Sequence, residues 1–170
     1  MVIREAKKAD AEYISLLARI TFDETFGHLF KDRKVLLEYF NTTFSVQKIR
    51  ESIQKENNVF WLAFMDDLPV GYSKLKINSS SEFLNLDNSS QLQKIYVLKD
   101  FLSTKIGFLL QEKLLEKAKI LGSKNIWLSV LRENKRAINF YKKSNFIEIG
   151  KHQFQIGEYT FNFIAMNKIL

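Results

Sequence analysis

Apolar residues recur along the first third of the chain with two different periods. Over residues 2–6 they alternate with polar residues, which predicts a strand. A spacing of three and four residues predicts a helix over residues 8–22, with a buried stripe made of Tyr13, Leu16, Leu17 and Ile20. The same spacing returns over residues 34–40 and 46–53, and Ser45 is placed to cap the second of these two short helices.

Extended segments that flank turn residues predict two antiparallel hairpins. Residues 59–65 and 70–77 are rich in apolar and aromatic side chains, and the Asp-Asp-Leu-Pro segment at residues 66–69 supplies turn chemistry between them. Near the C-terminus, residues 146–154 and 159–169 flank a second turn that contains a glycine. Both hairpins would contribute strands to a sheet.

A loop, a strand and a long helix are predicted next. Residues 78–90 are rich in Ser, Asn and Asp and lack periodicity, so we expect a surface loop. Residues 92–97 form the strand. The helix is expected over residues 103–122, where Gly122 can end it in a left-handed conformation. Its predicted buried side chains are Ile106, Leu109, Leu110, Leu114, Ala118 and Leu121.

A second strand and a short helix complete this central part of the chain. Residues 126–130 contain too few polar side chains for an edge strand, so we expect a central position in the sheet. The short helix begins at Lys135, presents Ala137, Ile138 and Tyr141 to the core, and ends near Asn145. This order places helix N-termini and cations at the ends of two strands, which suits a ligand that carries phosphates.

Composition agrees with one folded domain over residues 1–170. A chain of 170 residues buries enough surface for a real core. The 46% hydrophobic content, including 15 Phe, excludes a disordered chain. No apolar segment long enough for a membrane span and no signal peptide is evident, so we expect neither membrane insertion nor export. The absence of cysteine fits a reducing compartment, and we expect a cytoplasmic protein.

The charge of +7 is compatible with nucleic acid, an anionic membrane surface or a polyanionic cofactor as partner. No nucleic-acid-binding motif is present, so we expect no direct nucleic-acid partner, and lysines on solvated helix faces account for most of the excess. The two histidines, His28 and His152, lack further ligands at sensible spacing. We therefore expect no metal site.

The stretch from Asn134 to Phe146 carries a resemblance to a known family. Its pattern Asn134-x-x-Ala137-Ile138-x-Phe140-Tyr141 resembles the loop and helix after the fifth strand of the GCN5-related N-acetyltransferases (GNAT). The order of the predicted elements resembles that family over nearly the whole chain. Closer still, the chain resembles the bacterial PaiA-type spermidine/spermine N-acetyltransferases, on the segments Thr21-Phe22-x-x-Thr25-Phe26, Ile95-Tyr96-Val97 and Asn125-Ile126-Trp127-Leu128.

The resemblance implies an α/β (α+β) fold and a site for acetyl-coenzyme A as cosubstrate. The fold is a mixed, mostly antiparallel sheet of about seven strands flanked by about four helices. A bulge in the fourth strand would turn backbone groups of that strand toward the pantetheine, and a loop at a helix start would bind the pyrophosphate. The cofactor-binding residues that it implies are Ile95, Tyr96, Val97, Leu102, Ser103, Thr104, Lys105, Ile106, Gly107, Asn134, Lys135, Arg136 and Tyr141.

The pyrophosphate loop departs from the family pattern at two positions. Leu102 replaces a Gln or Arg, and Lys105 replaces the first glycine, which leaves Gly107. Glycine lets backbone approach phosphate closely, so the Lys105 side chain must swing outward, where it could pair with a phosphate oxygen. Otherwise the loop would bind coenzyme A weakly.

The resemblance also implies roles in catalysis. Tyr141 matches the acid near the thioester sulfur, because a phenol with an unperturbed pKa of about 10 is a proton donor at neutral pH. A buried structural tyrosine is the alternative. Asn134 would bind the pantetheine arm or cap the following helix, or do both, and Lys135 and Arg136 would lie near the phosphates or in solvent. Asp23, Glu24 and Glu133 are candidates for the base, and a water chain is an alternative.

The expected activity is acetyl transfer to a primary amine by direct attack, with spermidine and spermine as first candidates. The charge of +7 argues mildly against a polyamine. The alternatives are another small amine, a protein lysine or N-terminus, or a non-catalytic module that binds acyl-coenzyme A. A small-amine enzyme predicts a closed pocket formed by the first two helices and residues 78–90. The aromatic final hairpin could supply a homodimer surface as readily as core: Phe154, Tyr159, Phe161 and Phe163.

Overall fold

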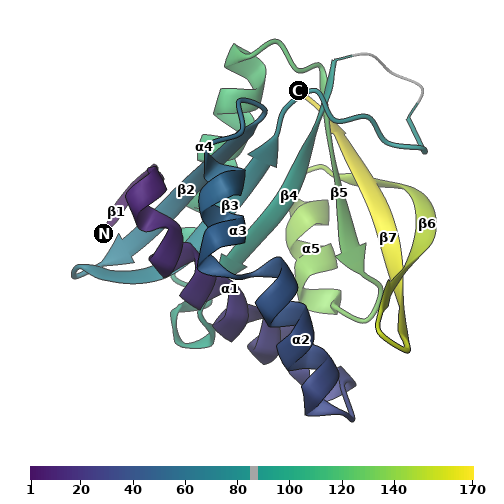
Figure 1. The fold of residues 1–170 in the computed structure, drawn as a ribbon. Coiled ribbons are helices and arrows are strands. Elements are labelled where there is room, and N and C mark those ends of the chain that lie inside the picture. Colours follow the sequence, from purple (N-terminus) through teal and green to yellow (C-terminus); the bar gives the residue numbers. More distant parts are fainter. Residues whose placement is uncertain (85–87) are drawn as a thin grey trace.

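The structure is a computed structural model that describes residues 1–84 and 88–170. Its strands form one seven-stranded sheet in the order β1-β2-β3-β4-β5-β7-β6 (Figure 1). Neighbouring strands are antiparallel except for the parallel pair of β4 and β5. The strands are β1 (Val2–Glu5), β2 (Asn58–Met65), β3 (Leu68–Lys76), β4 (Ser89–Val97), β5 (Asn125–Leu131), β6 (Ile147–Ile156) and β7 (Tyr159–Ile169).

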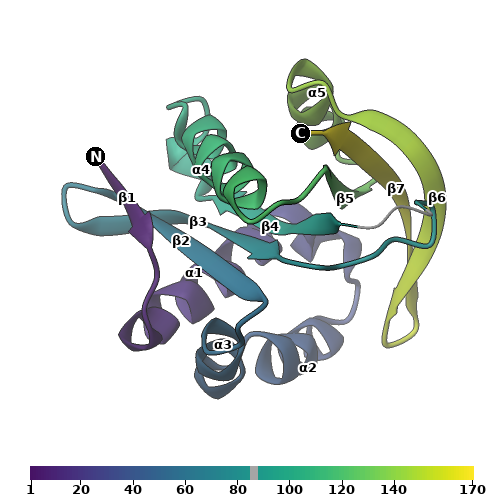
Figure 2. The same cartoon turned by 90° about the horizontal axis from the view of Figure 1, so that it is seen from above.

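Helices cover both faces of this sheet (Figure 2). One face carries α1 (Ala11–Phe26), α2 (Arg33–Thr43) and α3 (Val46–Ile53). The other face carries α4 (Ile106–Ile120) and α5 (Lys135–Lys143). Each face has its own core, because the strands alternate their side chains between the two sides. The expected mixed, mostly antiparallel sheet with flanking helices is thus confirmed.

The predicted elements are present with shifted ends. Ser45 caps α3, as predicted, by accepting a hydrogen bond from the Lys48 amide at 3.3 Å. The β2–β3 turn has positive φ at Asp66 and Asp67, and β5 lies centrally between β4 and β7. The predicted loop over residues 78–90 is shorter, because β4 already begins at Ser89. Its residues 85–87 lie outside the described residues.

The predicted buried stripe of α1 is wrong in phase. Tyr13, Leu16 and Ile20 are 46%, 55% and 39% exposed, and only Leu17 of the four is buried. Small residues on the buried face let the helix approach the strands closely. The buried residues of this face include Ala11, Ile14, Ser15, Leu17, Ala18, Thr21 and Phe22. A stripe chosen by the size of its hydrophobic side chains missed that face.

The predicted start and buried set of α4 also need correction. The helix begins at Ile106 instead of residue 103, because Ser103 and Lys105 have positive φ. Leu121 is 45% exposed, whereas Gln111 is fully buried and accepts a hydrogen bond from the Ser144 hydroxyl at 2.8 Å. Gly122 adopts the predicted left-handed conformation with φ of 83°.

An ion pair fastens the first strand to the start of α1. The Arg4 guanidinium donates to both carboxylate oxygens of Asp10, at 2.7 and 2.8 Å, and the Lys7 amide donates to the same carboxylate at 2.7 Å. The hydrogen bond from Arg4 lowers the pKa of Asp10, although burial opposes that shift. This pairing fixes where the chain leaves the sheet edge and begins α1.

We predict that Asp10→Asn lowers the free energy of unfolding by about 1–2 kcal/mol at pH 7, because it leaves Arg4 without its charged partner. Because the folded-state pKa of Asp10 is depressed, the loss should persist above about pH 4 and shrink as the pH falls further. Urea denaturation at several pH values measures it. Glu12→Gln, which breaks the more exposed Arg50 pair, is the control and should cost under about 0.5 kcal/mol. Equal losses for the two variants would contradict this account.

Candidate functional site

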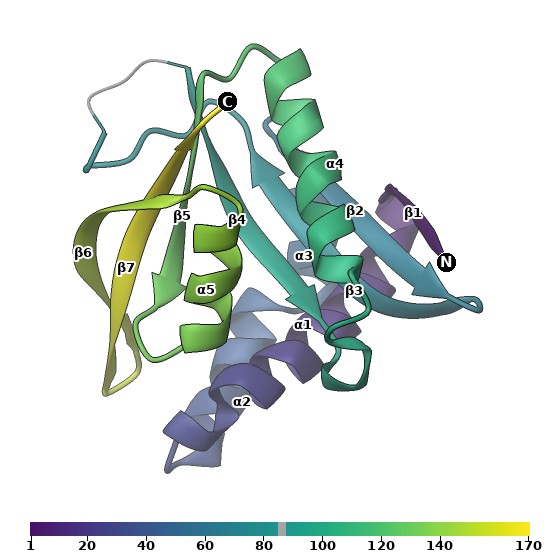
Figure 3. The same ribbon diagram turned by 180° about the vertical axis from the view of Figure 1, so that it is seen from behind.

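The parallel pair β4 and β5 separates after three residues. Ser89, Ser90 and Gln91 pair with Asn125, Ile126 and Trp127, and the pairing ends there. On its other side, β4 pairs with β3 through a bulge, since Lys74 lies opposite Lys94 and Leu75 lies opposite Leu92, which leaves Gln93 as the extra residue. Figure 3 shows the two strands diverging, with α5 beside the opening.

The separation leaves backbone groups of β4 without a strand partner. The Leu98 amide donates to the Val70 carbonyl at 2.9 Å. In an antiparallel pair, residues whose peptide groups bond to the neighbouring strand alternate with residues whose peptide groups point away from it. The peptide groups of Tyr96 therefore face β3, whereas those of Ile95 and Val97 face the opening toward β5. Backbone polar groups in such a position need a ligand or water as partner.

The opening forms part of a cavity of about 790 Å³ between β4, β5, α5 and the start of α4. Eleven of the predicted cofactor-binding residues line it: Ile95, Tyr96, Val97, Leu102, Ser103, Lys105, Gly107, Asn134, Lys135, Arg136 and Tyr141. Sequence reasoning missed other lining residues that the fold brings in, including Thr25, Lys99, Phe101, Phe108 and Phe140. They come from four separate segments, and the motifs that contain Thr25 and Phe140 indicate the family without marking these side chains as cavity lining.

Two predicted residues turn their side chains away from this cavity. Ile106 is 1% exposed and packs in the core under α4. The Thr104 hydroxyl donates to the Phe101 carbonyl at 2.5 Å and thereby closes the preceding turn. The backbone amides of these two residues are the groups that remain for a ligand, which is the role that the family resemblance implies for this loop.

The start of α4 presents unpaired amides near this cavity. The first backbone bond that closes the helix runs from the Leu109 amide to the Lys105 carbonyl at 3.0 Å, so the amides of residues 106–108 have no partner within the helix. Lys105, the N-cap residue, contributes no side-chain cap and has φ of 64°. An anion would satisfy these amides and the helix dipole. Lys105 is exposed and lines the cavity.

The second basic edge of the cavity is the start of α5. The Asn134 side chain accepts a hydrogen bond from the Ala137 amide at 3.0 Å, so the expected N-cap is confirmed. Arg136 donates to the Ser103 hydroxyl at 3.3 Å and thus bridges from α5 to the loop before α4. Lys135 and Arg136 are both exposed and line the cavity. With Lys99 and Lys105, they make this end of the cavity strongly positive.

Tyr141 lies in the buried wall of this cavity. It is 7% exposed, and its ring packs against Phe140 and Phe146 with centroid distances of 5.3 and 5.6 Å. Burial raises its pKa far above the ordinary phenol value, and a small electrostatic effect of Tyr96 acts in the same direction. The hydroxyl therefore stays protonated at neutral pH.

A second cavity of about 380 Å³ lies on the other face of the sheet, where α1, α2 and residues 80–83 meet β4 to β7. Tyr96 and Leu131 line both cavities, so the two spaces meet there. Nine aromatic side chains contribute to the wall: Phe22, Phe26, Tyr39, Phe83, Tyr96, Trp127, Phe154, Phe161 and Phe163. The aromatic residues of the final hairpin other than Tyr159 are thus part of this wall.

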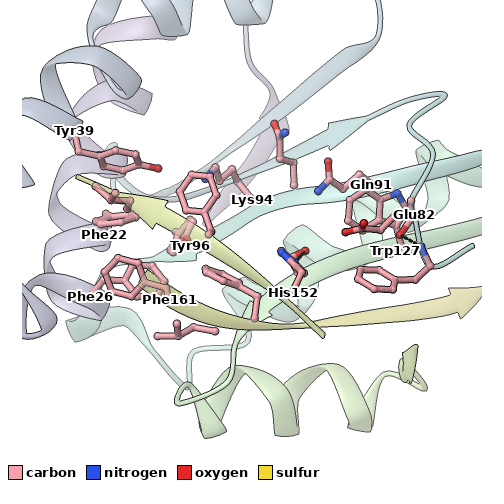
Figure 4. Close-up of a pocket in the computed structure, with 18 of the residues that line it drawn as sticks. Phe22, Phe26, Tyr39, Glu82, Gln91, Lys94, Tyr96, Trp127, His152 and Phe161 are labelled. Carbon is pink, nitrogen blue, oxygen red and sulfur yellow. Dashed lines mark hydrogen bonds between the residues drawn. The ribbon is translucent and has the colours of Figure 1, made fainter. Parts of the chain in front are cut away.

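Polar side chains also line the smaller cavity, from residues 80–82, β4, β5 and β6. Figure 4 shows Glu82, Gln91 and Trp127 at one end, Lys94 and Tyr96 in the middle, and Phe22 and Phe26 at the other end. The His152 ring nitrogen Nε2 lies 2.8 Å from the Ser129 hydroxyl, and the ring stacks on Phe163. Sequence reasoning treated His152 as structural and did not single out Lys94. The bulge, which breaks the alternation of β4, brings Lys94 and Gln93 into this wall together.

The carboxylates that sequence reasoning considered as bases have different surroundings. Asp23 is held by Arg33 in a two-point ion pair at 2.6 and 2.9 Å, which lowers its pKa, and it lines neither cavity. Glu24 and Glu133 line the larger cavity. Glu24 accepts a hydrogen bond from the Lys99 amide at 3.0 Å, which ties α1 to the loop before α4. Asp23 therefore has a structural partner and is the weakest candidate of the three.

Among residues 1–84 and 88–170, no group of three potential ligand side chains could hold a metal ion. Within the same part of the chain, no helix is long and apolar enough to cross a membrane.

Comparison with known proteins identifies the family. The model of the acetyltransferase (GNAT) family matches residues 22–146. A relative from Lactobacillus delbrueckii subsp. lactis, named as an N-acetyltransferase in the pepI 3' region, is 26% identical over 159 residues, 92% of this chain and 90% of its own. A spermidine N(1)-acetyltransferase from Thermoplasma acidophilum is 27% identical over 85% of this chain and 86% of its own.

Solved structures have the same fold. The PaiA N-acetyltransferase from Thermoplasma acidophilum, crystallised with coenzyme A, superposes with a TM-score of 0.80 at 22% identity over 99% of this chain and 98% of its own. A ribosomal-protein-alanine N-acetyltransferase from Brucella melitensis gives 0.73 at 19% identity over 100% of both chains. The chain belongs to the GNAT family of acetyltransferases, and the expected family is thereby confirmed.

We predict that Asn134→Ala lowers the free energy of unfolding by about 1 kcal/mol, because it removes the N-cap of α5. Asn134→Ser keeps a side-chain acceptor and should lower the free energy of unfolding by only about a few tenths of a kcal/mol. Thermal and urea denaturation of the purified variants measure the effect. Asn139→Ala, at an exposed position of the same helix, is the matched control and should be neutral or slightly stabilising. A neutral Asn134→Ala would contradict the capping role.

Proposed function

We propose that residues 1–170 form one N-acetyltransferase domain that transfers the acetyl group of acetyl-coenzyme A to a small primary amine. The observation that carries this proposal is the pair of cavities that meet at Tyr96 and Leu131. The larger cavity has the polar backbone and cations that a coenzyme requires, and the smaller one has the size of a small acceptor. Membership of the GNAT family supports the same reaction.

The groups that line the larger cavity favour one orientation of acetyl-coenzyme A. The unpaired peptide groups of Ile95 and Val97 would bind the amides of the pantetheine arm. The amides of residues 106–108 would bind the pyrophosphate, with Lys105, Lys135 and Arg136 available for phosphate oxygens. The thioester then lies toward Tyr141 and Tyr96. The complex of the structurally similar PaiA protein with coenzyme A supports this choice of ligand.

The lysine at position 105 retains the backbone conformation that glycine would supply. Its positive φ of 64° is unfavourable for a side chain by roughly 1 kcal/mol, and the surrounding turn must offset that cost. In return, the chain places a cation at the helix start, where the ligand would be anionic. Lys105 therefore supports phosphate binding in this proposal instead of preventing it.

The chemistry requires few groups from the protein. The neutral amine attacks the thioester carbonyl carbon, the carbon–sulfur bond breaks, and a proton passes from Tyr141 to the leaving sulfur. The nitrogen loses one proton to water or to a base, and Tyr141 is then reprotonated. Because burial keeps the Tyr141 phenol protonated, it can act as the acid, although it does so less readily than a group with a pKa near 7.

The acceptor enters the smaller cavity. The first two helices and residues 80–83 contribute to its wall, as expected for a small-amine enzyme, and its volume of about 380 Å³ suits a small molecule better than a folded protein partner. Spermidine and spermine are the acceptors that the family resemblance suggests. The spermidine N(1)-acetyltransferase relative supports them, and Glu82 would attract a cation, whereas Lys94 in the same wall would repel one.

Release of the coenzyme A thiol in the presence of acetyl-coenzyme A and an amine panel tests the proposed function. We expect turnover with at least one member among spermidine, spermine, simple monoamines and amino acids, and none with N-acetylated versions of the same amines. Binding of acetyl-coenzyme A without turnover of any amine would favour a non-catalytic acyl-coenzyme A-binding module. Turnover restricted to protein lysines or N-termini would contradict the small acceptor.

We predict that Tyr141→Phe lowers kcat by roughly 100-fold or more, because the leaving sulfur loses its proton donor. Acetyl-coenzyme A affinity should change by less than about threefold, since the ring remains in the wall. Steady-state turnover assays measure kcat, and calorimetry measures the affinity for acetyl-coenzyme A. Tyr13→Phe, at an exposed site of α1, is the control and should leave both unchanged. If Tyr141→Phe retains full turnover, Tyr141 is a structural tyrosine.

A further inference from the structure

Two lysines lie opposite each other on β3 and β4, and one of them lines the smaller cavity. Lys94 on β4 lines that cavity, and its direct partner across the sheet is Lys74 on β3. The Lys94 ammonium lies 5.7 Å from the centroid of the Phe44 ring, and Lys74 donates to the Ser52 hydroxyl at 3.0 Å. Within residues 1–84 and 88–170, neither ammonium has a carboxylate in ion-pair range.

The arrangement of these two lysines is energetically unfavourable when the cavity holds no anion. Burial lowers the pKa of Lys94 to about 8. Burial and, as the second cause, the positive charge of Lys94 lower the pKa of Lys74 to about 8. Like charges placed opposite each other in a sheet destabilise it, and an anionic partner stabilises a half-buried cation. An anion inside the cavity would relieve both costs.

The rest of the wall offers little competition for that anion. Glu82 is the one carboxylate among the described lining residues, and Figure 4 shows it away from Lys94, beside Gln91 and Trp127. The side chains nearest to Lys94 along the strand are neutral: Gln93 and Tyr96. Lys94 and Tyr96 are two positions apart, so these side chains start about 7 Å apart along β4. One small molecule could therefore reach from Lys94 to the junction of the two cavities.

We propose that the acceptor is an amine that also carries a carboxylate, and that this carboxylate pairs with the Lys94 ammonium while the amine lies at the junction near Tyr96. This inference rests on the proposed function and names its substrate class. An apolar or aromatic body between the two groups would pack on the rings of the wall. A polyamine would instead place its positive charges beside Lys94 and Lys74, which is unfavourable.

Matched acceptor pairs test this proposal. Each pair differs in the presence of a carboxylate that a spacer separates from the amine: 4-aminobutanoate against 1,4-diaminobutane, and 4-(aminomethyl)benzoate against benzylamine. We measure kcat/KM by coenzyme A thiol release for the natural chain, Lys94→Met, Lys94→Arg and the control Lys48→Met, whose site lies on the exposed face of α3.

We expect the natural chain to prefer the carboxylate member of a pair by about tenfold or more, as charged hydrogen bonds typically allow. Lys94→Met should remove that preference by lowering kcat/KM for the carboxylate member alone. Lys94→Arg should retain much of the preference, and Lys48→Met should behave as the natural chain. Preference of the natural chain for the diamine or for spermidine would overturn the inference but leave the acetyltransferase intact. An equal loss for both members in Lys94→Met would also overturn it.

A binding experiment tests the same site without turnover. Calorimetry with 3-phenylpropanoate, which has the carboxylate but no amine, should show binding to the natural chain that weakens about tenfold or more in Lys94→Met. Equal binding to both, or binding to neither, would overturn the role of Lys94. If the panel shows no turnover while this probe binds in a Lys94-dependent manner, the proposed reaction fails and the anion site stands.

Discussion

The loss of pairing between β4 and β5 is the constraint on which the rest of the site depends. Three residue pairs hold the strands together, and beyond Gln91 and Trp127 the two backbones diverge. The unpaired peptide groups of β4 cannot remain buried without partners, so the opening is suited to a polar ligand. The bulge at Gln93 turns β4 at the same place. A fully paired sheet would have neither the opening nor the junction between the two cavities.

Other elements are arranged around that opening. The amides that start α4, the Asn134-capped start of α5 and the cations near both helix ends lie along one side of it. Glu24 and Arg136 connect these parts through the Lys99 amide and the Ser103 hydroxyl, so the loop before α4 is held from two directions. On the opposite face, aromatic side chains line a cavity with Lys94 in its wall, and Lys94 has no carboxylate in ion-pair range among residues 1–84 and 88–170. A phosphate-bearing donor and a small acceptor would therefore approach the junction from opposite faces.

Much of this could be predicted from the sequence, and the misses have physical causes. Periodicity located the strands and helices, and the pattern around Asn134 and Tyr141 indicated the family, which the comparisons confirmed. The buried face of α1 was missed because small and polar residues share it with Ile14, Leu17 and Phe22. The start of α4 was misplaced because Ser103 and Lys105 adopt left-handed conformations that propensity does not reveal. Lys94 was overlooked because only the bulge, a property of strand pairing, brings it into a cavity wall.

A crystal structure of the chain with coenzyme A tests the central claim most directly. This account predicts the pantetheine between β4 and β5, bonded to the backbone of Ile95 and Val97, with the pyrophosphate at the amides of residues 106–108 and the sulfur beside Tyr141. Coenzyme A bound outside this opening, or a structure in which β4 and β5 pair along their full length, would contradict the account.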